Sequence, residues 1–238
     1  MNAAPIKVIF FDLGDTLMVH KEPWGQVLAR ASQKMESFGV EKHWINPNRG
    51  FGDEFLGRLK EYYLRRDRDL IEGTTIKLLR EIFNHDQVSD KHLKILLDVF
   101  YNETRDNWSA HPHATQILSY LSNKGYSLGL ISNAADREDV DQILDRFNFA
   151  HFFKLVLTSA DVGYRKPHPF IFKRALREMK SNPENTMMIG DRLDADIIGA
   201  LRLGLKAIWV DTLQLENSFC SDAEYKTVNN LSELINLL

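Results

Sequence analysis

Short, continuous apolar runs separated by helical patterns are the feature of this sequence that most restricts its fold. Five such runs are expected to form strands: Lys7–Phe11, Ser127–Ile131, Leu155–Thr158, Thr186–Ile189 and Lys206–Val210. Strands of a parallel sheet are covered on both faces, so their sequences are continuous hydrophobic runs and not alternating patterns. Because helical patterns lie between these runs, the sequence predicts an α/β fold with a doubly wound, mainly parallel sheet.

Two segments show the helical spacing most clearly. After Pro169, which suits the first turn of a helix, Ile171, Ala175 and Met179 recur at four-residue steps. The second segment is DADIIGALRLG, residues 194–204, where Gly204 is expected to end a helix. The predicted apolar face of that helix consists of Ile197, Ile198, Leu201 and Leu203.

The segment between the first two apolar runs carries no strand pattern. Residues 20–108 are rich in Leu, aromatic residues, Arg and Glu, with helical spacing in FLGRLKEYYLRR and DKHLKILLDVFYNE. A connection of this length needs secondary structure of its own. We therefore predict an inserted α-helical domain at 20–108 and an α/β core formed by 1–19 and 109–238, with hinges near His20 and Ser109–Pro112.

Composition and charge limit the functions that this chain can have. Its 238 residues carry a formal net charge of −3, whereas proteins that bind nucleic acid usually have a basic surplus. The single cysteine, Cys220, excludes an intramolecular disulfide and a cluster of thiolate metal ligands. No apolar run approaches the roughly 20 residues that span a bilayer, and the first residues lack a signal-peptide pattern. These features predict a cytoplasmic protein that binds neither nucleic acid nor membrane, and they leave its oligomeric state open.

Polar residues follow the predicted strands at the points where the strands end. They are Asp12, Ser132, Asn133, Lys166 and Asp191. Ligands of open parallel sheets bind at the carboxyl edge of the strands. We therefore expect these side chains to converge at that edge.

This set of groups suits the hydrolysis of a small phosphate ester. Asp12 can attack phosphorus as a nucleophile and form an aspartyl phosphate. Mg2+ held by Asp12 and Asp191 would reduce the repulsion between the carboxylate and the phosphate. Lys166 would add positive charge beside the transferred group, and Ser132 and Asn133 could contact its oxygens.

Four stretches of the chain resemble the motifs of the haloacid dehalogenase-like (HAD) hydrolase superfamily. They are DLGDTL, ISNA, RKPHP and IGDRLDADIIGA, in that order, and the insertion between the first two resembles the helical cap of that family. The resemblance covers nearly the whole chain. It implies that Asp12 is the nucleophile, that Ser132 contacts phosphate and that Lys166 is the charge-neutralising lysine.

The resemblance also implies a Mg2+ site. Asp12, Asp191 and the main-chain carbonyl of Gly14 match the family's direct metal ligands. Asp196 matches the second acidic position of the fourth motif, which commonly acts from the outer shell. Asp194 lies between the two acidic positions and matches neither.

The first motif departs from the usual phosphatase pattern, Asp-x-Asp-Gly-Thr. The second aspartate of that pattern protonates the leaving group and then activates water, but here Gly14 takes its place and the carboxylate follows at Asp15. A shift of one residue along an extended backbone turns a side chain to the opposite side. Asp15 could substitute for the missing acid, the enzyme could be limited to good leaving groups such as aryl and acyl phosphates, or the site could bind phosphate and metal with negligible turnover. The sequence does not show whether Thr16 contacts phosphate or only stabilises the loop.

Two other functions remain as alternatives. A 2-haloacid dehalogenase would share the fold and the aspartate nucleophile, but it needs no metal, so the complete acidic fourth motif argues against it. Because Gly14 takes the place of the acid/base aspartate, a binding protein or metabolite sensor with little or no catalysis is the other alternative.

The insertion carries two groups of residues with more than one interpretation. Arg65, Arg66 and Arg68 are expected on a solvated helix face, with contact to a substrate anion as the alternative. The aromatic residues are expected to belong to a core more than to a pocket: Trp24, Trp44, Tyr62, Tyr63 and Trp108. Closure of a mobile helical cap would exclude water and select the substrate.

Overall fold

Two compact units make up the protein in the computed structural model, which describes residues 5–83, 88–211 and 225–238. Cys220 lies outside the described residues. The first unit consists of Met1–Val19 and Ala110–Leu238, and the second of His20–Ser109. Strands β2 (Met18–His20) and β3 (Trp108–Ala110) pair where the chain passes between the units. Neither was predicted, because three residues are too few to produce a strand pattern.

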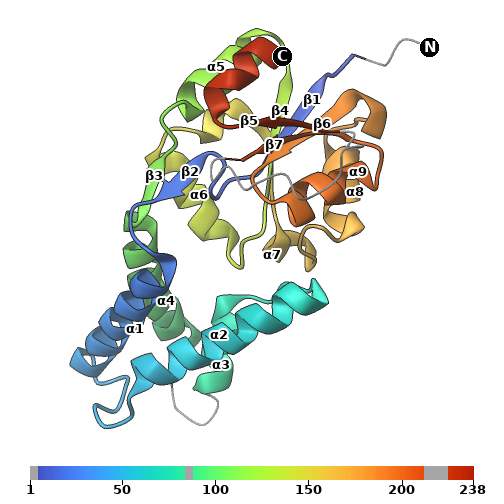
Figure 1. Ribbon diagram of the computed structural model, residues 1–238. Coiled ribbons are helices and arrows are strands. Elements are labelled where there is room, and N and C mark those ends of the chain that lie inside the picture. Colours follow the sequence, from blue (N-terminus) through green and yellow to red (C-terminus); the bar gives the residue numbers. More distant parts are fainter. Residues whose placement is uncertain (1–4, 84–87, 212–224) are drawn as a thin grey trace. The chain divides into compact units, whose positions relative to one another are not determined.

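The first unit is built on a six-stranded parallel sheet (Figure 1). Its strands are β1 (Val8–Phe11), β4 (Ser127–Ser132), β5 (Phe153–Thr158), β6 (Thr186–Gly190), β7 (Lys206–Val210) and β8 (Tyr225–Val228). Their order is β5-β4-β1-β6-β7-β8, and every pair is parallel. The predicted α/β fold is confirmed. Of the six strands in this sheet, β8 is the one that the sequence did not predict, because it is an edge strand with two exposed residues and no continuous apolar run.

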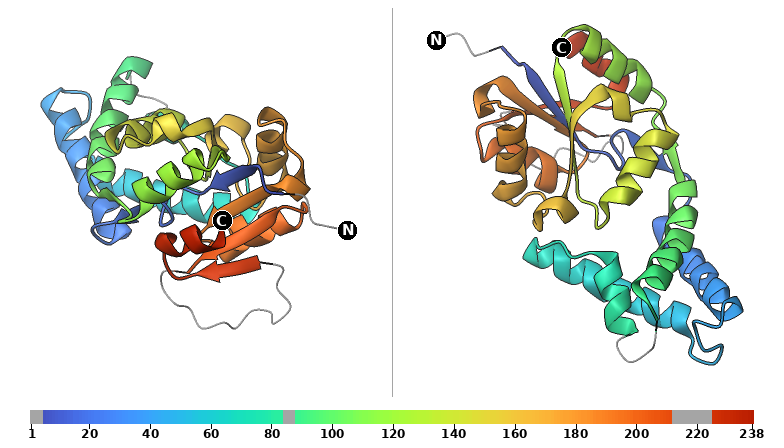
Figure 2. Two further views of the ribbon diagram at one scale, coloured as in Figure 1. Left: turned by 90° about the horizontal axis from the view of Figure 1, so that it is seen from above. Right: turned by 180° about the vertical axis from the view of Figure 1, so that it is seen from behind.

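Helices cover both faces of this sheet (Figure 2). Helix α5 (Ala114–Asn123) packs against β4, and α6 (Arg137–Arg146) packs against β5. Helices α8 (Pro169–Glu178) and α9 (Ile198–Leu201) lie on the opposite face, where Phe172 and Ala200 join Phe10, Ile131 and Met188 in one buried cluster. The remaining short elements are α7 (Ser159–Val162), α10 (Leu234–Leu237) and the 3-10 turns Ala150–Phe152, Pro183–Asn185 and Leu231–Glu233.

The direction in which the chain adds strands to the sheet reverses between β1 and β6. From β1 the chain continues outward through β4 and β5 in one direction, and from β6 it continues through β7 and β8 in the other. Ligands of doubly wound sheets bind where the order reverses, at the carboxyl ends of the strands. Asp12 directly follows β1 and Asp191 directly follows β6, so both lie at this reversal.

The proline expected at the start of α8 and the glycine expected to end the helical segment after β6 both have the predicted kind of conformation. Pro169 is the first residue of α8, as predicted, and the His168 side chain caps the helix by accepting from the Phe170 N–H at 3.2 Å. Gly204 has a φ of +80°, a left-handed conformation that suits the residue after a helix.

The sequence predicted that Ile198 lies on the buried apolar face of the helical segment after β6, and this prediction is wrong. Ile197 is fully buried, but Ile198 is 36% exposed, and Leu201 and Leu203 are half-buried. The preceding residues, Leu193–Ile197, form a π-helical turn. A π-turn has a longer repeat than an α-helix, so the four-residue spacing does not keep these side chains on one face.

Over its described residues, the second unit has four helices around a core of its own. They are α1 (Trp24–Glu41), α2 (Phe51–Asp69), α3 (Thr75–Ile82) and α4 (Asp90–Asp106). Helix α1 packs against α2 and α4, and α3 packs against α4. The core includes Met35, Phe51, Phe55, Leu79 and Phe100. None of the described helices has the length and hydrophobicity needed to cross a membrane.

Four of the five aromatic residues singled out in the sequence belong to the core of this unit or pack against it, as predicted. Tyr62 is buried in the core, and Trp24, Trp44 and Tyr63 pack against it. Trp108 stacks on His20 with ring centroids 3.8 Å apart.

The expectation of a solvated face is wrong for one of the three arginines. Arg66 lies over the Tyr63 ring, 3.9 Å from its centroid, and ion-pairs with Glu72 at 3.5 Å. Its side chain is only 14% exposed because the guanidinium packs back onto its own unit. Arg65 and Arg68 are exposed, and Arg68 pairs with the neighbouring Asp69.

Candidate active site

Asp12 is held at the end of β1 by the sheet itself. Its N–H donates to the Ile189 carbonyl at 2.9 Å, so the backbone still runs beside β6 at this point. The chain then turns, because the Leu13 carbonyl accepts from the N–H groups of Leu17 and Met18, each at 3.0 Å. The loop after the strand is therefore closed by its own backbone, with Asp12 buried at its base.

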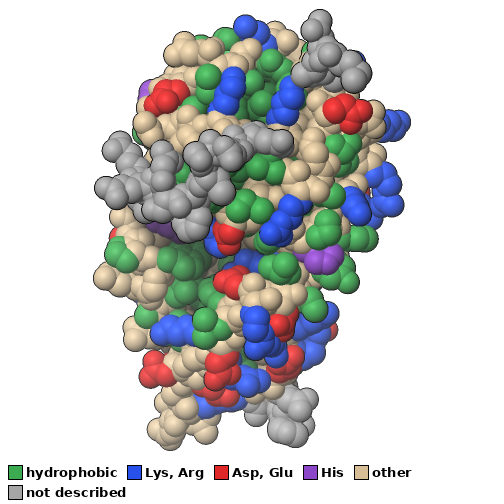
Figure 3. All heavy atoms as spheres, turned by 45° about the vertical axis from the view of Figure 1, so that its right-hand side comes forward, with side chains coloured by type: hydrophobic (Ala, Val, Ile, Leu, Met, Phe, Trp, Pro, Cys, Tyr) green, Lys and Arg blue, Asp and Glu red, His purple; other side chains and the backbone are tan. Residues whose placement is uncertain are grey.

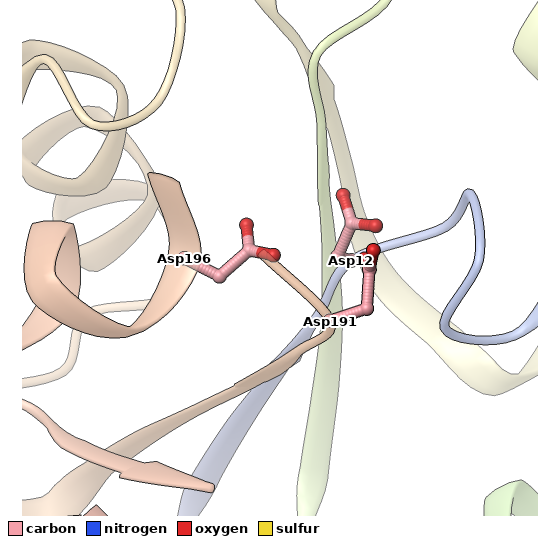
Figure 4. A group of neighbouring side chains, drawn as sticks. All are labelled: Asp12, Asp191 and Asp196. Atoms are coloured by element: carbon pink, nitrogen blue, oxygen red, sulfur yellow. The ribbon is translucent and has the colours of Figure 1, made fainter. Parts of the chain in front are cut away.

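Three carboxylates meet at this edge of the sheet (Figure 4). One oxygen from each of Asp12, Asp191 and Asp196 lies within 4.8 Å of the others. Figure 4 shows Asp12 and Asp191 side by side at the ends of their strands, with Asp196 pointing toward them from the helical turn after β6. The structure thus brings together three of the residues that the sequence placed at one site.

Lys166 joins this cluster from the loop after β5. Its side chain is 1% exposed, and its Nζ lies 2.5 Å from Asp12 Oδ1 and 2.7 Å from Asp196 Oδ1. It also donates to the Ile131 carbonyl at 2.7 Å. The contacts with Asp12 and with the Ile131 carbonyl are hydrogen bonds, and the contact with Asp196 Oδ1 is an ion pair. Lys166 therefore bridges the candidate nucleophile and one of the other acids.

Asn133 holds the backbone of Lys166. Its Oδ1 accepts from the Lys166 N–H at 2.8 Å, and its Nδ2 donates to the Lys166 carbonyl at 3.0 Å. Both ends of the amide thus bind one residue, which favours a positioning role for Asn133 over the phosphate contact expected from the sequence. Ser132 ends β4 nearby in the sequence, and its hydroxyl has no hydrogen-bond partner among the described residues.

The turn that carries Asp196 is packed closely on the end of β6. Asp196 Oδ2 accepts from the Arg192 N–H at 3.0 Å, and the Asp196 N–H donates to the Arg192 carbonyl at 2.8 Å. A Cβ at Gly190 would lie 2.3 Å from Asp196 Oδ2, so only glycine fits there. Asp194, which matched no metal position, pairs with Arg192 and is largely exposed.

Thr16 is a site residue whose role the sequence left undecided. It is fully buried, and its hydroxyl donates to Asp191 Oδ1 at 3.1 Å. The same hydroxyl lies 3.5 Å from Asp12 Oδ2. Thr16 therefore connects the first and fourth motifs, a contact that the sequence pattern could not identify because the two residues are far apart in the chain.

Asp15 is exposed and has a φ of +57°, a left-handed conformation that aspartate tolerates. Its charge raises the pKa of Asp191, but less than the charges of Asp12 and Asp196 do. Gly14 is half-buried and forms an isolated backbone bridge with Met18. Ligation of a metal by the Gly14 carbonyl stays a prediction.

The cluster has more negative than positive groups. Burial, and then the charges of Asp12 and Asp196, raise the pKa of Asp191 to about 8. Burial also raises the pKa of Asp196, to about 6, even though the Lys166 ammonium opposes this. Burial alone would lower the pKa of Lys166, but the two carboxylates outweigh it and the pKa lies above its ordinary value.

This donor set fits a divalent cation. Hard cations such as Mg2+ take carboxylate oxygens as ligands, and close, buried carboxylates repel one another without a cation. One ammonium offsets only part of the charge of three carboxylates. Asp196 already contacts Lys166 through Oδ1 and the Arg192 N–H through Oδ2, whereas Asp12 contacts Lys166 through Oδ1 alone. Ligation of the ion by Asp12 and Asp191 stays a prediction.

Comparisons with known proteins show the family of this chain. A family model described as haloacid dehalogenase-like hydrolase matches residues 48–210. A glyceraldehyde 3-phosphate phosphatase of Methanocaldococcus jannaschii is 34% identical over 235 residues, which cover 98% of this chain and 97% of that protein. One from Pyrococcus furiosus is 29% identical over 246 residues, which cover 98% and 93%. A crystal structure of a 2-haloacid dehalogenase from Pseudomonas syringae shares the fold, with a TM-score of 0.72, 24% identity and coverage of 98% and 97%.

Proposed function

This chain belongs to the haloacid dehalogenase-like hydrolase family, and on that basis we propose that it is a Mg2+-dependent phosphatase of a small phosphorylated metabolite. The family resemblance that the four motifs indicated is confirmed. The observation that carries the proposal is the buried Lys166 ammonium, which contacts Asp12 and Asp196 beside Asp191 at the reversal of the strand order. The names of the two relatives support a phosphatase and make glyceraldehyde 3-phosphate the first alkyl phosphate to test.

In the proposed first step, a carboxylate oxygen of Asp12 attacks phosphorus. The bond between phosphorus and the ester oxygen breaks, and the leaving group departs as the aspartyl phosphate forms. Lys166 holds Asp12 Oδ1 and so fixes the orientation of the carboxylate, while its charge lies beside the transferred group. Ser132 is available to donate to a phosphate oxygen. Mg2+, held by Asp12 and Asp191, would neutralise negative charge on the phosphate.

In the second step, water attacks the phosphorus of the aspartyl phosphate and releases inorganic phosphate and the free Asp12 carboxylate. Because Gly14 replaces the usual acid/base aspartate and Asp15 is exposed, we propose that proton transfer at the leaving group is weakly assisted. A positioned acid or base typically contributes about 10²–10⁴ in rate. The enzyme would therefore favour leaving groups that need no proton, as in aryl and acyl phosphates.

A phosphatase screen tests this proposal. The panel contains an aryl phosphate, acetyl phosphate and glyceraldehyde 3-phosphate, each with Mg2+ and with a chelator. We expect Mg2+-dependent release of phosphate, fastest from the aryl and acyl esters, and loss of activity in Asp12→Asn. The matched control is Asp194→Asn, which removes an exposed carboxylate of the same motif and should stay close to wild type. Equal release in chelator, or an active Asp12→Asn variant, would contradict the proposal.

The second candidate is a binding protein with negligible turnover, and the observation that favours it is Gly14 at the acid/base position. Tight binding of phosphate with no release from any ester in the panel would support it. A 2-haloacid dehalogenase is less favoured, because a cluster of three acids around a lysine suits a cation better than a departing halide. Release of halide from chloroacetate in chelator would revive it.

Three wider expectations are part of the same proposal. We propose that the helical unit acts as a cap that selects the substrate, that the protein works in the cytoplasm, and that it binds neither nucleic acid nor membrane. On the face drawn in Figure 3, acidic and basic side chains of the described residues are interspersed, whereas proteins that bind nucleic acid usually gather basic side chains on one face.

A further inference from the structure

The peptide group between Asp191 and Arg192 is bound at both of its polar ends. On one side, Trp209 Nε1 donates to the Asp191 carbonyl at 2.7 Å. On the other, the Arg192 N–H donates to Asp196 Oδ2 at 3.0 Å. The carbonyl and N–H of a trans peptide point in opposite directions, so these two contacts fix the rotation of the whole peptide plane.

The sheet brings Trp209 to this position. Trp209 lies on β7 and is paired in register with Gly190, the last residue of β6. It is 6% exposed, and it packs with Ile197 and Ala207 under the π-helical turn. The indole N–H is the only polar group of the side chain, and a buried tryptophan usually needs a partner for it. Here the partner is the backbone of a candidate metal ligand.

We propose that Trp209 is a positioning residue for the metal ligand Asp191. The indole fixes the backbone from which the Asp191 carboxylate projects, and Thr16 holds one oxygen of that carboxylate at 3.1 Å. Trp209 touches neither substrate nor metal in this role. The inference rests on the proposed function, because it assumes that Asp191 binds Mg2+.

The test compares two variants of β7 by calorimetric titration with Mg2+ alone. Trp209→Phe keeps an aromatic ring in the cluster but removes the N–H. Ile208→Val trims the neighbouring, fully buried residue, whose side chain points to the other face of the sheet. We expect Mg2+ binding to weaken by about three- to tenfold in Trp209→Phe, as for the loss of one hydrogen bond, and to be unchanged in Ile208→Val. A purely structural role predicts lower stability in both variants and unchanged Mg2+ affinity in both.

A second readout is the indole N–H signal of Trp209 in the wild-type protein, measured by nuclear magnetic resonance. The chain has four tryptophans, and the other three, Trp24, Trp44 and Trp108, belong to the second unit. In a nitrogen–proton correlation spectrum, the indole signal that disappears in Trp209→Phe identifies Trp209. That signal should shift most during a Mg2+ titration of the wild type, with the dissociation constant found by calorimetry.

The outcomes separate this inference from the proposed function. If the wild type binds no Mg2+, the proposed function fails and this inference fails with it. If the wild type binds Mg2+ but Trp209→Phe binds it equally well, or the Trp209 signal does not move, the positioning role is overturned and the proposed function stands.

Discussion

Lys166 places a positive charge among three carboxylates, of which Asp12 and Asp196 are buried and Asp191 is half-buried. Its ammonium donates to Asp12 and to the Ile131 carbonyl and ion-pairs with Asp196, and its pKa lies above the ordinary value because the two carboxylates outweigh burial. A lysine held in this way keeps its proton. It is suited to offset charge and to orient Asp12, and it is not suited to protonate a leaving group.

The first prediction follows for Asp15. Because its carboxylate is exposed and its backbone is left-handed, Asp15→Asn should leave the hydrolysis of an aryl phosphate within about threefold of wild type, far from the factor of about 10²–10⁴ lost with a positioned acid. Steady-state kinetics on aryl phosphates of decreasing leaving-group pKa would measure this, with rates that rise as that pKa falls. A large loss in Asp15→Asn, greatest for the poorest leaving group, would show instead that Asp15 is the acid.

For the individual residues, the sequence predicted which side chains meet at the candidate active site, but it did not predict which of them bind one another. Asp12, Lys166, Asp191 and Asp196 could be predicted because each follows a strand or lies in a recognisable motif. The amide of Asn133 could not be assigned to the Lys166 backbone, since that contact depends on the path of a loop. A motif shows the place of a side chain along the chain, whereas its partner is set by the tertiary fold.

Among the elements, the end of β6 packs closely on the turn that carries Asp196. Gly190→Ala would place a Cβ 2.3 Å from Asp196 Oδ2 and displace that carboxylate. We expect a loss of about 1–3 kcal/mol in the free energy of unfolding, typical of overpacking, together with weaker Mg2+ binding. Chemical denaturation and calorimetry measure the two effects.

The matched control for this variant is Gly57→Ala in α2. Gly57 is exposed, and a Cβ there meets no atom within 4 Å. Alanine is favoured over glycine inside a helix by roughly 0.5–1 kcal/mol, so this variant should be more stable than wild type and should bind Mg2+ normally. If both alanines had the same effect, the close packing at Gly190 would not matter for the site.

The elements also show where sequence patterns stop being informative. Continuous apolar runs predicted five strands because each is covered on both faces of the sheet. Strand β8 pairs only along one side and exposes Lys226 and Thr227, so it has no such run. The π-turn at Leu193–Ile197 interrupts the four-residue spacing of an α-helix, so the sequence pattern did not predict which side chains are buried there. The same turn brings Asp196 back to the end of β6.

For the whole molecule, His111 makes stability depend on pH. Burial lowers the pKa of His111 below its usual value of 6.5, and the nearby His113 adds to this. The folded state then binds fewer protons than the unfolded state, so the contribution is present above the unfolded pKa and is lost as pH falls through the folded one. Denaturation at about pH 7.5 and about pH 5 should show a smaller loss of stability on acidification in His111→Gln than in wild type. Equal losses in the two proteins would contradict this.

The central claim for the whole molecule is that residues from distant parts of the chain converge to make Asp12 a nucleophile toward phosphorus. The most direct measurement is rapid-quench peptide mass spectrometry during turnover of an aryl phosphate in Mg2+. The account predicts a phosphate adduct on the peptide that contains Asp12, absent in chelator and in Asp12→Asn. Release of inorganic phosphate with no adduct on any peptide, or with the adduct on another residue, would contradict it.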